Sequence, residues 1–267
     1  MTNLLAQFMA SLEAEGLSPR TLEGYRAHVT RFLDWGNLTV VTSGTLIAYQ
    51  AHLLLSLSPA SVGTYMIGVK RFVAWLEVAH PLLVASPLRW PAPPRAKRNP
   101  PRVAVDKDVQ RVVHYVQPHI RLAILLMYRM GIRIGEVLSL QWDEVDLAKG
   151  EILVHRKGGD TQRLPILGGD LITYLRESAQ ESGYVVDGSR SMVSRAIANA
   201  CAQVGVGPIN PHSLRHRFAI NAATEGRPIL AVSAMLGHAR LSTTDTYLRG
   251  FQRDDPDYLR GAMNDAE

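Results

Sequence analysis

Pro211-His-Ser-Leu-Arg-His216 is the stretch on which the fold assignment of this chain rests. Proline is well tolerated in the first turn of a helix, so the stretch predicts a helix that begins at Pro211 and continues to Glu225. His212 and Arg215 are three residues apart and therefore share one face of that helix. Together an imidazole and a guanidinium can bind a phosphate group and transfer a proton, whereas either one alone is more often a packing or surface residue.

His212 and His216 are four residues apart, a spacing that also occurs in zinc sites. A metal ion would need a third ligand and would lie beside the positive charge of Arg215. We therefore expect no metal here and predict that His216 is a core residue or a support for its neighbours.

The turn GIRIGE, which begins at Gly131, carries a second arginine, Arg133, where a predicted helix ends. Glu136 follows three residues later and is a possible ion-pair partner of this arginine. Downstream, a predicted hairpin turn carries Lys157, followed by two glycines that permit a close approach of another molecule. Lysines in turns are ordinarily only solvated, but a flexible hairpin could bring this ammonium to a leaving oxygen as a general acid.

The motifs LGH and TTDTY complete the set. Gly237 is typical of the left-handed residue that ends a helix, which would leave His238 at the helix exit. Tyr247 falls on a short predicted helix that begins at Ser242. Cleavage of a phosphodiester without a metal requires cations on the phosphate oxygens, a nucleophile and an acid for the departing oxygen. Six candidate catalytic residues could supply these groups: Arg133, Lys157, His212, Arg215, His238 and Tyr247.

In these motifs the chain resembles the tyrosine recombinase, or phage integrase, family over nearly its whole length. The resemblance implies a mainly α fold with a small β-sheet, in which Tyr247 is the nucleophile and the other five residues assist it. It further implies a helical, SAM-like core-binding domain at residues 1–88 and a catalytic domain at residues 106–267. Two positions depart from the family pattern without altering the six residues: Arg156 replaces a common glycine, and Arg217 a frequent threonine.

A proline-rich segment divides the chain, because seven of the 15 prolines lie between residues 81 and 101. Proline has no amide donor and disfavours a helix at the preceding residue, so we expect an extended connector. The linker is predicted at residues 89–105 and is basic.

An internal repeat marks the first domain: residues 17–35 and 57–75 share eight identities at an offset of 40 residues. Each copy begins with serine at a helix N-cap and proline in the first turn, then places apolar residues on one stripe. We predict four helices, with the shorter two at residues 2–15 and 43–55. Similar helix starts without a common origin remain an alternative to duplication.

The second domain is predicted to be mostly helical, with a hairpin formed by residues 151–155 and 163–166. The predicted helices cover residues 109–130, 135–140, 170–182, 192–204, 211–225, 229–236 and 242–248. A terminal helix is expected from about residue 254. Its apolar residues could dock on a neighbouring protomer or pack on their own chain.

The net charge of +5 arises entirely in the first 105 residues, which hold 10 Lys and Arg but only 5 Asp and Glu. A solvated basic linker would be unremarkable by itself. Together with a phosphate site, however, the excess predicts contacts with double-stranded DNA. The expected DNA-binding residues are Arg20, Arg26, Arg31, Lys70, Arg71, Arg95, Lys97, Arg98 and Arg102.

The sequence lacks a signal peptide and an apolar run of membrane-spanning length, so we expect a cytoplasmic protein with no membrane partner. Cys201, the single cysteine, can form no internal disulfide and is predicted to be a buried packing residue. No cofactor is expected, neither metal nor ATP, because a covalent link to tyrosine would conserve the free energy of the phosphodiester.

The family resemblance implies a site-specific recombinase that cleaves and rejoins DNA through a 3′-phosphotyrosyl intermediate, in integration, excision or resolution. Exchange between two duplexes needs four cleavages, so it also implies a homo-oligomer, a tetramer on two DNA sites. Two alternatives stay open. One is a type IB topoisomerase-like enzyme, which would relax DNA as a monomer, and the other is a DNA-binding regulator that does not cleave.

Overall fold

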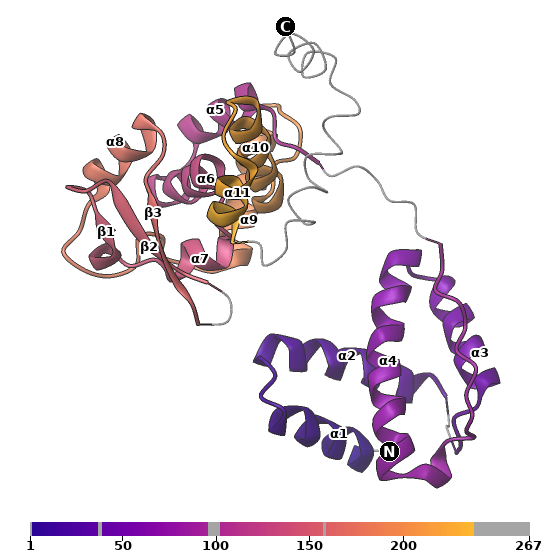
Figure 1. The fold of residues 1–267 in the computed structure, drawn as a ribbon. Helices are drawn as coiled ribbons and strands as arrows, with labels where there is room; N and C mark the ends of the chain where they lie inside the picture. The colour runs from indigo at the N-terminus through magenta and orange to yellow at the C-terminus, as the bar shows by residue number, and fades with distance from the viewer. Residues whose placement is uncertain (1, 37–38, 96–101, 157–158, 238–267) are drawn as a thin grey trace, which may run out of the picture. The chain divides into compact units, whose positions relative to one another are not determined.

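The computed structural model describes residues 2–36, 39–95, 102–156 and 159–237, and the chain divides into two units, residues 1–99 and 100–267 (Figure 1). The first unit contains the four helices that the sequence predicts. They are α1 (Thr2–Ala14), α2 (Pro19–Trp35), α3 (Ser43–Leu54) and α4 (Pro59–Ala79), followed by a short 3₁₀ turn, η1 (Pro81–Leu83).

The two repeated segments form α2 and α4, and they begin in the same way. Ser18 and Ser58 cap these helices with nearly identical backbone angles (φ −62°, ψ 148° and φ −65°, ψ 150°), and each hydroxyl accepts a hydrogen bond from the amide three residues later. The equivalent residues Phe32 and Phe72 are fully buried in one core. The predicted caps and the predicted apolar stripe are therefore confirmed.

The start of the predicted linker contacts the first unit. The backbone amide of Arg89 donates to the hydroxyl of Ser43 over 2.8 Å, and the side chain of Gln50 donates to the carbonyl oxygen of Ala92 over 2.9 Å. Trp90 packs against the core of this unit. Proline-rich chain up to residue 92 thus contacts α3 and the core of the first unit.

The end of the predicted linker contacts the second unit. Ala104 is buried there, and its amide donates to the carbonyl oxygen of Ser213 over 3.3 Å. Arg217, one of the two departures from the family pattern, donates from Nε to the carbonyl oxygen of Ala104 over 2.5 Å. This arginine therefore ties the entering chain to the helix that begins at Pro211.

Helix α6 is the centre of the second unit, because it packs against five other helices of that unit, α5, α7, α8, α9 and α10. The sequence prediction of one helix over residues 109–130 was wrong. Pro118 starts a new helix and holds the preceding Gln117 in an extended conformation (φ −60°, ψ 152°), which separates α5 from α6. The helices are α5 (Asp106–Tyr115), α6 (Pro118–Met130), α7 (Ile134–Ser139), α8 (Gly169–Ser178), α9 (Arg190–Gln203), α10 (Pro211–Thr224) and α11 (Ile229–Leu236).

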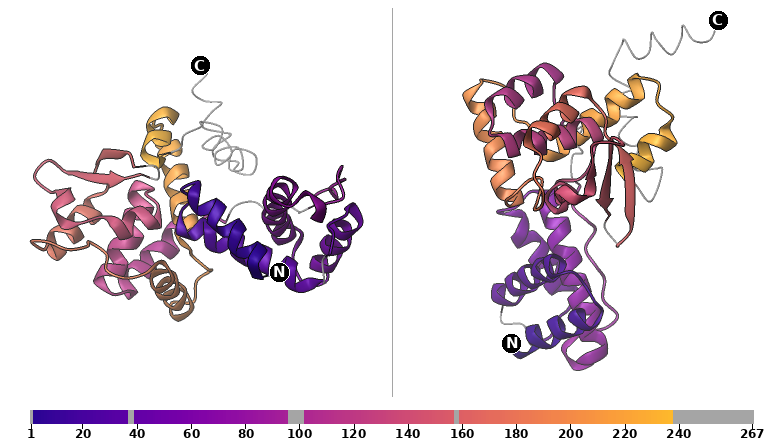
Figure 2. Two further views of the ribbon diagram at one scale, coloured as in Figure 1. Left: turned by 90° about the horizontal axis from the view of Figure 1, so that it is seen from below. Right: turned by 90° about the vertical axis from the view of Figure 1, so that its left-hand side faces the viewer.

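A small antiparallel sheet lies beside the helical core of this unit (Figures 1 and 2). The predicted hairpin is confirmed as β2 (Glu151–His155) and β3 (Thr161–Pro165), with Val154 opposite Gln162. The short 3₁₀ turn η2 (Trp142–Glu144) precedes a third strand, β1 (Val145–Asp146), which was not predicted. Two residues are too few to show an alternating pattern, so only its pairing with β2 reveals it.

Two predicted core residues of the second unit are buried: Cys201 is 3% exposed and His216 is 4% exposed. Both lie on helices, α9 and α10, whose apolar neighbours belong to the same core. In the part of the chain that the structure describes, no helix combines the length and the apolar character of a bilayer span.

Gly131 ends α6 in the left-handed conformation (φ +66°), where α6 meets α10 and α11. A Cβ atom at this position would lie 2.2 Å from Cδ1 of Phe218 and 2.9 Å from Cδ2 of Leu236. We expect Gly131→Ala to lower the free energy of unfolding by about 2–4 kcal/mol, because backbone strain adds to overpacking. Denaturant titration of the full chain, followed by circular dichroism, measures this loss.

Gly226→Ala is the matched control for this substitution. Gly226 also has positive φ (+72°) just after a helix, but a Cβ atom there would meet nothing within 4 Å. In this variant only backbone strain should lower the free energy of unfolding, by about 1 kcal/mol. Equal losses in the two variants would contradict the role given to packing at Gly131.

Candidate active site at the end of helix α11

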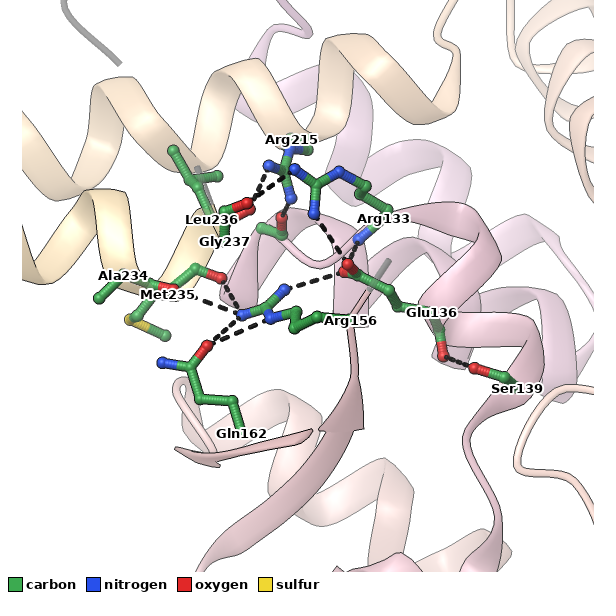
Figure 3. Close-up of polar contacts among 11 residues, drawn as sticks. Arg133, Glu136, Ser139, Arg156, Gln162, Arg215, Ala234, Met235, Leu236 and Gly237 are labelled. Carbon is green, nitrogen blue, oxygen red and sulfur yellow. Dashed lines mark hydrogen bonds and ion pairs between the residues drawn. The ribbon is translucent and has the colours of Figure 1, made fainter. Parts of the chain in front are cut away.

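Three arginine side chains from different elements converge on the last turn of α11 (Figure 3). Arg156, Arg215 and Arg133 donate in that order to the carbonyl oxygens of residues 235, 236 and 237, over 2.7 Å for Arg156 and 3.0 Å for Arg133. The last carbonyl groups of a helix have no partner inside the helix and lie at the negative end of its dipole. The end of α11 therefore gathers and orients the guanidinium groups.

Arg133 is held by Glu136, the partner that the sequence spacing predicted. Its backbone amide donates to one carboxylate oxygen over 2.7 Å, and its Nη1 atom donates to the other over 2.8 Å. Both contacts exist because Arg133 is the N-cap of the short helix α7 and Glu136 lies in the first turn. The Arg133 side chain is 39% exposed, so this residue is more accessible than the buried Glu136 that holds it.

Arg215 lies in the first half of α10 and is only 4% exposed. Its guanidinium donates to the carbonyl oxygens of Gly131 and Leu236. These contacts join the end of α6, the beginning of α10 and the end of α11. The planar fork of arginine suits this bridge because it can reach two acceptors at once.

His212 lies in the first turn of α10, two residues after the capping residue Asn210, whose side chain accepts a hydrogen bond from the His212 amide over 3.0 Å. The His212 ring lies edge-on to the His216 ring, with 4.3 Å between the centroids. Partial desolvation lowers the pKa of His212, and the positive charge of Arg215 lowers it further. The imidazole is therefore held neutral near pH 7, which suits a group that accepts a proton.

Arg156 belongs to this cluster, although the sequence analysis identified it only as a departure from the family pattern. Its side chain is 9% exposed, and Nη1 lies 3.0 Å from a Glu136 carboxylate oxygen. Nε and Nη2 donate to the Gln162 side chain over 3.1 and 2.9 Å. Sequence spacing could not reveal this role, because its partners lie on α7, β3 and α11.

The cluster is rich in positively charged groups. Arg133, Arg156 and Arg215 bring three formal charges together, and the buried carboxylate of Glu136 is shared by Arg133 and Arg156. Such a site favours an anion, and arginines in a fixed arrangement match the oxygens of a phosphate group. Within the described ranges, no group of three or more His, Cys, Asp or Glu side chains is placed to hold a metal ion.

Three of the six predicted catalytic residues, Arg133, His212 and Arg215, belong to this part of the second unit. Lys157, His238 and Tyr247 lie outside the described residues. Two of them directly follow residues of the cluster in sequence: Lys157 comes after Arg156, and His238 comes after Gly237. Gly237 is left-handed (φ 59°, ψ 45°), as its place in the LGH motif predicted.

The predicted DNA-binding residues of the first unit are in part engaged within the protein. Arg71 forms an exposed ion pair with Glu15 at 2.5 Å. The guanidinium of Arg31 lies 5.3 Å from the centre of the Tyr65 ring and donates to Ser56.

The remaining basic candidates differ in their surroundings. Arg26 lines a shallow hollow on α2. Glu23 and Asp34 also line this hollow, so both positive and negative charges surround it. Lys70 lies 5.9 Å from the centre of the Trp90 ring. Arg20, Arg95 and Arg102 are exposed, and residues 97 and 98 lie outside the described ranges.

The chain is similar in sequence to one known protein family and to individual tyrosine recombinases. Residues 103–253 match the model of the Phage integrase family. Tyrosine recombinase XerA of Thermococcus kodakarensis is 30% identical, with 92% of this chain and 90% of the relative covered. Tyrosine recombinase XerC of Yersinia pestis is 27% identical, with 86% and 84% covered.

Solved structures show the same fold. A lambda integrase dimer bound to a COC′ core site superposes with a TM-score of 0.76 at 16% identity, covering 92% of this chain and 94% of that chain. The crystal structure of XerA recombinase gives a TM-score of 0.54 at 22% identity, with 98% of both chains covered. The resemblance in fold thus extends beyond the residues that the family model matches.

Proposed function

Because this chain belongs to the phage integrase family and is a site-specific tyrosine recombinase, we propose that it breaks and rejoins double-stranded DNA through Tyr247. The observation that carries the assignment of the site is the convergence of Arg133 and Arg215 on the end of α11, one residue before His238. Two guanidinium groups beside a neutral imidazole form a site for a phosphodiester whose charge increases during the reaction.

In the proposed reaction, the Tyr247 oxygen attacks the scissile phosphorus and the 5′-oxygen of the next nucleotide leaves. The products are a 3′-phosphotyrosyl bond and a free 5′-hydroxyl. A phenol has an ordinary pKa of about 10, so it must lose its proton as it attacks. His212 assists that transfer, and Lys157 gives a proton to the departing oxygen.

The cations stabilise the transition state of this reaction. Arg133 and Arg215, with His238, bind the non-bridging oxygens, whose negative charge must be balanced as the phosphorus becomes pentacoordinate. Attack by a 5′-hydroxyl of a partner strand then releases the tyrosine. The phosphotyrosyl bond conserves the free energy of the broken phosphodiester bond, so the reaction consumes no ATP.

The proposed assembly is a tetramer on two DNA sites in the cytoplasm. A lambda integrase tetramer bound to a Holliday junction is among the similar structures, with a TM-score of 0.71 at 18% identity. The basic residues of the first unit and of the linker would then follow the DNA backbone. Affinity should fall steeply as salt rises, because each phosphate contact releases counterions.

We expect the cleavage rate to stay constant as the pH falls through about 6.5, the ordinary pKa of histidine, and to decrease only at lower pH. The neutral form of His212 accepts the proton, and desolvation with the charge of Arg215 lowers its pKa. Single-turnover cleavage measured across the pH range tests this, and His212→Gln should flatten the acid limb. A wild-type midpoint above the ordinary value would contradict the assignment.

A nicked suicide duplex tests the proposed function directly. Its short 5′-product diffuses away after cleavage, so the protein stays covalently attached to the DNA. Target sites are first selected from random DNA by binding, and the attached residue is then identified by peptide mapping. A phosphotyrosine at position 247 and exchange between two selected sites support recombination. Relaxation of supercoiled DNA without exchange would indicate a topoisomerase-like enzyme, and binding without an adduct would indicate a regulator.

A further inference from the structure

Arg156 connects three elements of the second unit. Its guanidinium contacts Glu136 on α7, Gln162 on β3, and the carbonyl oxygens of residues 234 and 235 on α11, the last two over 3.4 and 2.7 Å (Figure 3). Each of these elements adjoins a proposed catalytic residue. Glu136 holds Arg133, Arg156 directly precedes Lys157 in the sequence, and Gly237, which ends α11, directly precedes His238.

The side chain is committed to these contacts. All three guanidinium nitrogens donate to protein acceptors, which are a carboxylate, an amide oxygen and two carbonyl oxygens, and only 9% of the side chain is exposed. Arg156 therefore has little capacity to bind DNA. Burial lowers the pKa of Arg156, whereas the Glu136 carboxylate raises it. An arginine nevertheless stays charged at any working pH.

The backbone supports this arrangement on both sides. At the hairpin, the amide of Arg156 donates to the carbonyl oxygen of Asp160 over 2.7 Å, and the amide of Gly159 donates to the carbonyl oxygen of Arg156 over 3.2 Å. At the helix end, a Cβ atom on Gly237 would lie 3.0 Å from Cζ of Arg156. Glycine at 237 therefore provides the room in which the guanidinium packs against the turn.

We propose that Arg156 is a positioning residue for DNA cleavage: it fastens the hairpin base and the end of α11 to Glu136, and so fixes the carboxylate and the helix end to which Arg133 and Arg215 donate. The inference rests on the proposed function. Arg156 acts through Glu136, Gln162 and the α11 carbonyls and does not touch the substrate.

The test compares Arg156→Met with the wild-type chain in two measurements, DNA affinity and single-turnover cleavage of the suicide duplex at saturating protein. We expect cleavage to slow by about 10²-fold, since a misplacement of about 1 Å has an effect of that size, while affinity stays the same. Arg156→Lys should be intermediate, because its ammonium keeps the charge but cannot reach all the acceptors.

Arg163→Met is the matched control. Arg163 is an exposed residue of β3 on the same hairpin, and its loss should leave the cleavage rate unchanged. Gln162→Ala removes one partner of Arg156 and should slow cleavage in the same direction by a smaller factor. This variant keeps the inference testable if Arg156→Met does not fold, as judged by its melting transition.

Two outcomes would overturn the inference. In one, folded Arg156→Met or Gln162→Ala cleaves as fast as the wild type. In the other, affinity falls as much as the cleavage rate, which would make Arg156 a DNA contact. A wild-type chain that forms no adduct would instead refute the proposed function, so the two failures are distinguishable.

Discussion

Tyr247→Phe is expected to abolish covalent attachment to DNA and strand exchange, with a rate decrease of about 10⁴-fold or more. Phenylalanine keeps the ring and removes only the oxygen that attacks the phosphorus. The other cations and histidines remain, so the variant should bind its site with wild-type affinity. Adduct formation on the suicide duplex and a binding titration at one salt concentration measure the two effects separately.

Tyr258→Phe is the control for this experiment. Tyr258 is the next tyrosine in the chain and lies outside the TTDTY motif. Its variant should form the adduct at the wild-type rate. If Tyr247→Phe still formed an adduct while Tyr258→Phe did not, the nucleophile would be misassigned and the reaction would need another site.

The second large effect is expected for Arg215→Lys, which should slow cleavage by about 10³-fold, within the range known for arginines that stabilise phosphoryl-transfer transition states. Lysine keeps the charge but loses the planar fork. Its single nitrogen replaces the two, Nη1 and Nη2, with which Arg215 donates to the carbonyl oxygens of Gly131 and Leu236, so we expect one of these carbonyls to lose its partner. The unpaired carbonyl should lower the free energy of unfolding by about 1–3 kcal/mol.

Arg121→Lys is the control that separates slower cleavage from reduced stability. Arg121 lies on α6, donates to the carbonyl oxygen of Val113 over 2.9 Å and packs 4.7 Å from the centre of the Tyr174 ring, away from the cluster at α11. Its replacement should reduce stability without slowing cleavage. A comparable loss of cleavage in both variants, at a temperature where both are folded, would mean that Arg215 serves the fold alone.

Much of the fold follows from local sequence. Ser18 with Pro19 and Ser58 with Pro59 mark helix starts through side-chain caps and a fixed proline φ, and both starts are confirmed. Gly237 marks a helix end because glycine adopts the left-handed conformation without strain. Where a local signal was overlooked, as at Pro118, the prediction merged two helices into one.

The candidate site, like the fold, follows from the sequence only in part. Motif and spacing selected Arg133, Arg215 and His212, and a separation of three residues predicted the contact between Arg133 and Glu136. The roles of Lys157, His238 and Tyr247 rest on the motifs alone and remain predictions. The DNA contacts of the first unit were predicted from its excess of Lys and Arg, and they also remain predictions.

Apart from the break between α5 and α6, the sequence by itself therefore determined where the helices lie, the hairpin and the kinds of side chain available for phosphodiester chemistry, because these depend on neighbours within a few positions. Only the tertiary structure decided that Arg156 shares Glu136 with Arg133, and that three arginines meet at the end of α11. Those contacts join residues 20 to 104 positions apart. No local pattern encodes them, because packing of α6, α7, α10 and α11 around one core brings the partners together.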